Sequence, residues 1–181
     1  MIRLEQQGST LSRYINYIEI FVIGGLSLLL LAQLIQLLGV DVWRQDSMYY
    51  VESYKDKLIS EGRWINKLFF PFLRIIPAQI CILLSYLCLG YFVYAVCNNI
   101  SGNRKYALAV SLLCLNIPVL SVQLEWPETI LFAFLFLPLT VSEAKKIPDY
   151  LYFPIFSILF FGTFSAFYFL LPLLFLPQYR Q

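Results

Sequence analysis

The chain has 181 residues, of which 60% are hydrophobic and 13% are charged, and its mean hydropathy is +0.71. A soluble core of this size does not need so many apolar residues, so water is excluded as the main solvent. The formal net charge is only +2, and no Lys/Arg-rich run carries interleaved aromatic residues, so nucleic acid is excluded as an expected partner.

The apolar residues fall into blocks of roughly membrane length, which predicts an all-α integral membrane protein with about five transmembrane helices. In chain order the blocks are 20–40, 75–96, 106–124, 129–141 and 150–176. The first block has no charged residue, and at about 1.5 Å per residue it is long enough to cross a hydrocarbon layer of about 30 Å. Glu19 precedes it and is expected to lie at the headgroups without a functional role. We expect residues 1–181 to form a single polytopic domain.

Polar residues and prolines interrupt the later blocks. Residues 98–105 predict a tight polar turn between the second and third spans. Asn116 and Pro118 predict a kink in the third span, and Pro154 and Pro172 are candidates for breaking the fifth.

The cysteines are interpreted as packing residues. All lie in or beside apolar blocks, without a CxxC pair and without any histidine in the chain: Cys81, Cys88, Cys97 and Cys114. No metal site and no cofactor is therefore expected.

The orientation follows from the short turns, since the total numbers of Lys and Arg on the two sides are nearly equal. Arg104–Lys105 and Lys145–Lys146 are paired cations in two of these turns, whereas residues 125–128 carry none. Cytoplasmic loops are enriched in Lys and Arg, so the N-terminus is predicted to be cytoplasmic and the first loop to face outward.

The first loop contains most of the polar chemistry. Five of the eleven acidic residues lie between Asp41 and Glu61. An amphipathic helix on the membrane surface is predicted there, ended by Gly62, because apolar residues recur at the spacing of one helical face. These residues are Tyr50, Val51, Tyr54 and Leu58.

Asp41 and Asp46 directly follow the first span. A carboxylate at the boundary of lipid and water can act as a general base toward a water-soluble hydroxyl, with a lipid-borne donor beside it. The alternative is structural: Asp46–Ser47 would cap a helix, and Asp41 would be a solvated loop residue.

Basic and aromatic residues of the loop also have two interpretations. Arg44, Arg63 and Lys67 can hold a lipid phosphate, or they are ordinary headgroup contacts. Trp43 and Trp64 fit an aromatic belt at the membrane interface, and a sugar-stacking role is the alternative.

The second outward loop holds Glu125, Trp126 and Glu128. Carboxylates accept hydrogen bonds from sugar hydroxyls and an indole stacks on an apolar sugar face, so this loop is a candidate sugar-binding element. A Trp-Pro turn at the interface is the alternative. The chain has no Walker loop, no GxGxxG, no HExxH and no nucleophile elbow.

Two short stretches suggest a family. Asp46-Ser47-Met48-Tyr49-Tyr50, followed by Ser60-Glu61-Gly62-Arg63-Trp64, resembles the N-terminal part of the bacterial glucosyltransferases that modify O-antigen, the type II Gtr proteins. Those in turn resemble the GT-C class of polytopic, polyprenyl-phosphate-sugar-dependent glycosyltransferases. The resemblance covers mainly residues 1–130.

The resemblance implies an enzyme of the bacterial inner membrane. It would transfer glucose from undecaprenyl-phosphate glucose to lipopolysaccharide O-antigen on the periplasmic side. Asp46 best matches the acidic base of the first periplasmic loop, with Asp41 second, and Arg63 would contact the phosphate. Members of this family have more than five spans, so the chain is expected to correspond to the N-terminal part of a larger fold. Six residues are the candidates for substrate binding: Arg63, Glu61, Trp64, Arg44, Glu125 and Trp126.

Two other functions stay open at this stage. A non-catalytic small membrane protein, or an inactive remnant of an enzyme, agrees with the short chain and with the lack of an ionisable pair inside the spans. A small transporter would need polar or broken helices at the bilayer midplane, for which only Asn116 with Pro118 gives a hint.

Overall fold

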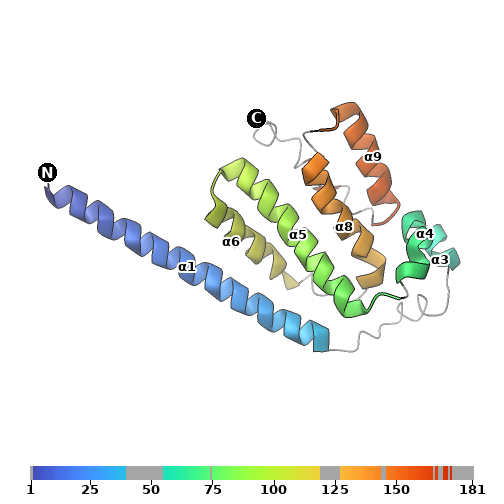
Figure 1. The fold of residues 1–181 in the computed structure, drawn as a ribbon, viewed down its shortest axis with the longest axis horizontal. Helices are drawn as coiled ribbons and strands as arrows, with labels where there is room; N and C mark the ends of the chain where they lie inside the picture. Colours follow the sequence, from blue (N-terminus) through green and yellow to red (C-terminus); the bar gives the residue numbers. More distant parts are fainter. Residues whose placement is uncertain are drawn as a thin grey trace.

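A computed structural model of the chain describes residues 2–39, 55–73, 75–118, 127–143, 146–164, 166, 169–170 and 172. Its helices are α1 (Ile2–Gly39), α3 (Lys55–Ser60), α4 (Trp64–Leu73), α5 (Ala78–Ser101), α6 (Arg104–Leu115), α8 (Pro127–Glu143) and α9 (Asp149–Phe161) (Figure 1). No strand occurs in these ranges, so the predicted all-helical class is confirmed for them.

Two helices are long and apolar enough to cross a membrane. They are the segment Tyr14–Gly39 of α1 and the whole of α5, Ala78–Ser101. They correspond to the first and second predicted spans. The second begins after Pro77, where a proline costs a helix no internal hydrogen bond.

The other apolar helices are shorter in the structure than the predicted spans. α6 ends at Leu115, where the sequence predicts a kinked continuation. The backbone N–H of Asn116 instead donates to the carbonyls of Leu112 and Leu113 in a closing turn. Pro118 explains this end, since a proline disfavours helical conformation in the residue before it. In contrast, α9 continues through Pro154 and ends before Gly162.

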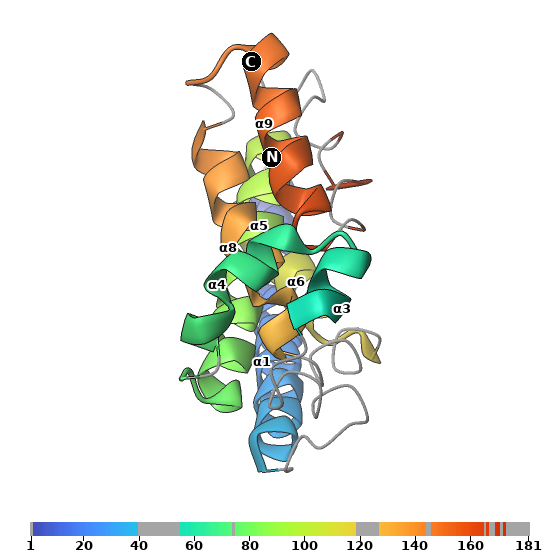
Figure 2. The ribbon, with the colours of Figure 1, turned by 90° about the vertical axis from the view of Figure 1, so that its right-hand side faces the viewer.

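The apolar helices form one layer, in the spatial order α1, α6, α5, α8, α9 (Figure 1). Figure 2 shows the same layer from its edge as a narrow column, with α3 and α4 toward the viewer. Successive apolar helices run in opposite directions along the chain. One end of the layer, called here the α4 end, therefore holds the start of α5, the start of α8 and α4, and the two short turns lie at the other end.

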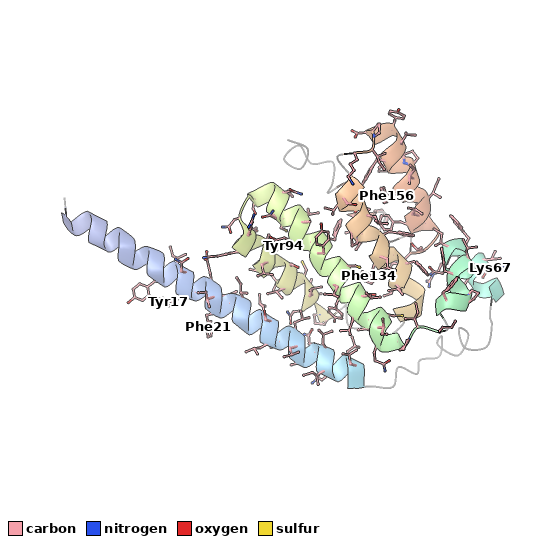
Figure 3. The ribbon with its side chains drawn as sticks, in the orientation of Figure 1. Tyr17, Phe21, Lys67, Tyr94, Phe134 and Phe156 are labelled. Carbon is pink, nitrogen blue, oxygen red and sulfur yellow. The ribbon has the colours of Figure 1, made fainter. Side chains whose placement is uncertain are left out.

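The largest buried cluster lies where α5, α8 and α9 meet. Phe134 of α8 and Phe156 of α9 point into it (Figure 3), and both are almost fully buried. The hydroxyl of Tyr152, on α9, donates to the backbone carbonyl of Thr140, on α8, at 2.9 Å. This bond satisfies a buried phenol and also joins the two helices.

α5 and α6 approach closely at Gly90. The hydroxyl of Ser111 donates to the Gly90 carbonyl at 2.8 Å, and a Cβ at position 90 would lie 3.0 Å from Leu115 Cδ1. Small residues at such crossings allow backbones to pack in a membrane, where burial of apolar surface gives no driving force.

α1 is attached to α6 by polar contacts at two levels. The ammonium of Lys105 donates to Glu19 Oε2 and Asn16 Oδ1, both at 2.8 Å. Further along, the Asn116 side chain donates to the Leu26 carbonyl at 3.1 Å. The predicted interfacial residue Glu19 thus lies at the same end of the layer as the turn that carries Lys105.

The face of α1 away from α6 is apolar and open. Tyr17 and Phe21 project away from the other helices (Figure 3) and are 69% and 81% exposed. Exposing such a surface to water costs free energy, about 25 cal/mol per Å² of apolar area. A lipid environment removes this cost.

Candidate functional site

The Glu61-Gly62-Arg63-Trp64 element is a tight connection between α3 and α4. The N–H of Gly62 donates to the Ile59 carbonyl at 2.9 Å, and the N–H of Arg63 donates to the Leu58 carbonyl at 2.7 Å. This pair of bonds is a Schellman motif, which needs a left-handed residue directly after the helix. Gly62 supplies it with a φ of +75°, so the predicted helix end at Gly62 is confirmed.

Gly62→Ala is expected to weaken this connection through backbone strain alone. A Cβ at position 62 would meet nothing within 4 Å, so the cost is the left-handed conformation, about 1–2 kcal/mol for an L-residue. Gly62→Asn should cost less, because asparagine tolerates this region. Thermal unfolding in detergent should show the highest stability for the native chain, a lower one for Gly62→Asn and the lowest for Gly62→Ala. Equal stability of the two variants would contradict the strain argument.

The burial of Leu58 differs from its predicted place on the membrane surface. The sequence predicts Leu58 on the apolar face of a surface helix, but its side chain is only 1% exposed and is therefore covered by the protein. Tyr50, Val51 and Tyr54, the other residues of that predicted face, lie outside the described residues. Exposed apolar side chains of this segment occur on both helices, Ile59 on α3 and Leu68 and Phe72 on α4.

The start of α4 is docked on the end of α9. The N–H of Ile65 donates to the Gly162 carbonyl at 2.9 Å. A Cβ built on Gly162 would lie 2.6 Å from Trp64 Cε2 and 2.8 Å from Ile65 Cδ1, so the indole and the Ile65 side chain occupy the space that any larger residue would need. The φ of Gly162 is −76°, which every residue adopts, so glycine is required here for space alone.

Arg63 lies between an acidic and an aromatic neighbour. Its Nε is 3.3 Å from Glu61 Oε2, and its guanidinium carbon is 5.7 Å from the centre of the Phe164 ring. These two contacts fix the guanidinium while leaving its terminal amino groups without a carboxylate partner among the described residues. Lys67 follows one turn later, its N–H donating to the Arg63 carbonyl at 3.1 Å. Together the two cations can bind an anion such as a phosphate.

The structure thus brings together three of the predicted site residues, Glu61, Arg63 and Trp64. The remaining ones fall outside the described residues: Asp41, Arg44, Asp46, Glu125 and Trp126.

Sequence reasoning missed Gly162 and Phe164, which hold the element from the other side. A signal was present, because Gly162 is the only glycine after Gly102 and it interrupts a run rich in phenylalanine. An isolated glycine inside an apolar block indicates a helix end or a close approach of another segment.

Among the described residues, no three His, Cys, Asp or Glu side chains are close enough to hold a metal ion, and the four cysteines are free thiols.

Comparison of the chain with protein-family models, curated proteins and solved structures gives no match.

Proposed function

We propose that this chain is a bacterial membrane glycosyltransferase of the type II Gtr kind. It would transfer glucose from undecaprenyl-phosphate glucose to lipopolysaccharide O-antigen at the periplasmic face of the inner membrane. The proposal rests on the resemblance of residues 46–50 and 60–64 to that family, and on the contacts of Arg63 with Glu61 and Phe164.

The topology proposed is five membrane spans with a cytoplasmic N-terminus. α1 and α5 are two of these spans, and the segments containing α6, α8 and α9 are the other three. The alternating helix directions support this arrangement, because they put the start of α6, with the paired cations Arg104 and Lys105, at the end of the layer opposite α4. Paired cations in a short turn are favoured on the cytoplasmic side, so we assign the α4 end to the periplasm.

The guanidinium of Arg63 is the observation that carries the proposal. Glu61 and Phe164 hold it beside the start of α4, at the end of the layer where α5 and α8 begin, and a lipid phosphate at the membrane surface would be within its reach. A pre-organised guanidinium stabilises the charge that develops on a departing phosphate, and a fixed planar fork does this better than a flexible ammonium.

The reaction requires one base and one departing phosphate. Asp46 would accept the proton of the acceptor hydroxyl while that oxygen forms a bond to the anomeric carbon of glucose. The bond between the anomeric carbon and the phosphate oxygen breaks, and its electron pair leaves with undecaprenyl phosphate. Arg63 would hold that phosphate, and Trp64, Arg44, Glu125 and Trp126 are candidates for contacts with the sugar or the lipid headgroup.

The test is the transfer of labelled glucose in membranes that contain the chain and undecaprenyl-phosphate glucose. Arg63→Gln should reduce transfer by roughly ten- to a hundredfold, since a charged hydrogen bond to phosphate is worth about 1.5–3 kcal/mol. Arg63→Lys should restore only part of it, because the bidentate geometry is lost. Arg104→Gln, an exposed arginine at the opposite end, is the matched control and should leave transfer unchanged. Equal transfer by the Arg63 and Arg104 variants would refute the role of Arg63.

A further inference from the structure

α4 has one exposed apolar face and one face that is buried in the protein. Trp64, Leu68 and Phe72 are 48%, 65% and 63% exposed, and their spacing puts them on one face within an arc of about 80°. Ile65 and Asn66 lie on another face and are buried in the protein. Phe69 adds to that inner face by packing on Phe132 of α8, with ring centres 4.7 Å apart. The exposed residues Trp64, Leu68 and Phe72 are called here the outer face of α4.

Two cations line one border of the outer face. Arg63, directly before α4, and Lys67, one helical turn later, are both partly exposed, and the N–H of Lys67 donates to the Arg63 carbonyl (Lys67 is labelled in Figure 3). No acidic residue occurs within α4. An apolar face bordered by cations is the pattern of a helix that lies in the interface of a bilayer with anionic lipids.

The neighbouring span fixes the depth of this face. α4 ends at Leu73, and the membrane-length helix α5 begins at Ala78, so the two helices share one boundary of the bilayer. Figure 1 shows α4 at the end of the layer where α5 and α8 begin. Ile75, in the connection, is 80% exposed and extends the apolar surface toward α5.

We propose that the outer face of α4 is a lipid-binding surface. It inserts among the acyl chains just below the headgroups of the leaflet on the α4 side, and Arg63 and Lys67 bind the phosphates of anionic phospholipids there. The occupant is the bilayer itself, because its apolar layer matches the outer face and its anionic headgroups match the cationic border. This interaction does not depend on the transfer reaction and exists in the absence of any sugar donor.

The test uses the fluorescence of Trp64 in the full chain reconstituted into vesicles. Trp43→Phe combined with Trp126→Phe leaves Trp64 as the single indole and preserves its contact with Gly162. In phosphatidylcholine vesicles, lipids brominated near the headgroup should quench Trp64 more strongly than lipids brominated near the acyl-chain ends, and aqueous acrylamide should quench it weakly. Strong acrylamide quenching would show a face in water, and weak quenching by every reagent would show a face covered by protein; either result overturns the proposal.

A second measurement tests the cations. In mixed vesicles, brominated phosphatidylglycerol should quench Trp64 more than the same fraction of brominated phosphatidylcholine, and each cation is expected to contribute about a fivefold preference. Arg63→Gln with Lys67→Gln should remove the preference while keeping the depth profile, and Arg104→Gln should change neither. A preference that survives the double substitution would refute the assigned role of the two cations. If the unsubstituted chain transfers no glucose but Trp64 shows the expected depth profile, the proposed enzyme is refuted and the lipid-binding surface still holds.

Discussion

Asp46→Asn is expected to abolish glucose transfer, with a loss of roughly a hundredfold to ten-thousandfold, the usual contribution of a general base. Asparagine has nearly the size of aspartate but cannot accept the proton of the acceptor hydroxyl. The variant should still insert into membranes and bind the lipid-linked donor, because neither step uses this proton transfer. The measurement is labelled glucose transferred to O-antigen by equal amounts of membrane-inserted protein.

Two variants separate this role from the alternatives. Asp41→Asn should retain more activity than Asp46→Asn, since Asp41 is the second candidate for the base. Asp149→Asn removes an exposed carboxylate in the first turn of α9, at the end of the layer opposite α4, and should leave transfer unchanged. If Asp46→Asn keeps full activity, Asp46 is a helix cap or a loop residue and the base lies elsewhere.

Gly162→Ala is expected to have the largest effect on stability, a loss of about 1–3 kcal/mol from overpacking. The added methyl group would lie 2.7 Å from Trp64 Nε1 and 2.8 Å from Ile65 Cδ1. The Ile65 side chain is only 3% exposed, so it has little room to move away from the added methyl group. The substitution should separate the start of α4 from the end of α9, and with it move Arg63 away from Phe164.

The control for Gly162→Ala is Gly25→Ala in α1, where a new Cβ meets nothing within 4 Å. Alanine is a better helix former than glycine, so this variant should be neutral or slightly more stable. A double-mutant cycle identifies the clash: Gly162→Ala should cost less in a Trp64→Ala background than in the native chain. Equal costs in the two backgrounds would show that Trp64 does not fill the space beside Gly162.

The apolar blocks predicted two long helices well, because a membrane-length run without charge has few other stable structures in lipid. The same reasoning was less accurate where a proline or glycine ends a helix early. α6 ends before Asn116, and α9 ends before Gly162, although the apolar residues continue in both places. Hydropathy reports the environment of a segment, whereas the end of a helix depends on individual backbone groups.

The site was predicted in part. Glu61, Gly62, Arg63 and Trp64 were selected from the sequence, and Gly62 ends α3 as predicted. Their contact with Gly162 was not foreseen, since local patterns contain no information about which distant segment packs on an element. Leu58 shows a related limit: a helical pattern identifies an apolar face but does not tell whether lipid or protein covers it.

The side of the membrane on which residues 41–67 lie is the central claim, and labelling of single cysteines tests it most directly. Ser60→Cys and Ser101→Cys, both exposed and at opposite ends of the layer, are introduced separately into a chain whose four native cysteines are replaced by alanine. A membrane-impermeant maleimide should label position 60 in intact cells and position 101 only after the inner membrane is permeabilised. Labelling of position 101 but not position 60 in intact cells would put the first loop in the cytoplasm and contradict the proposed enzyme.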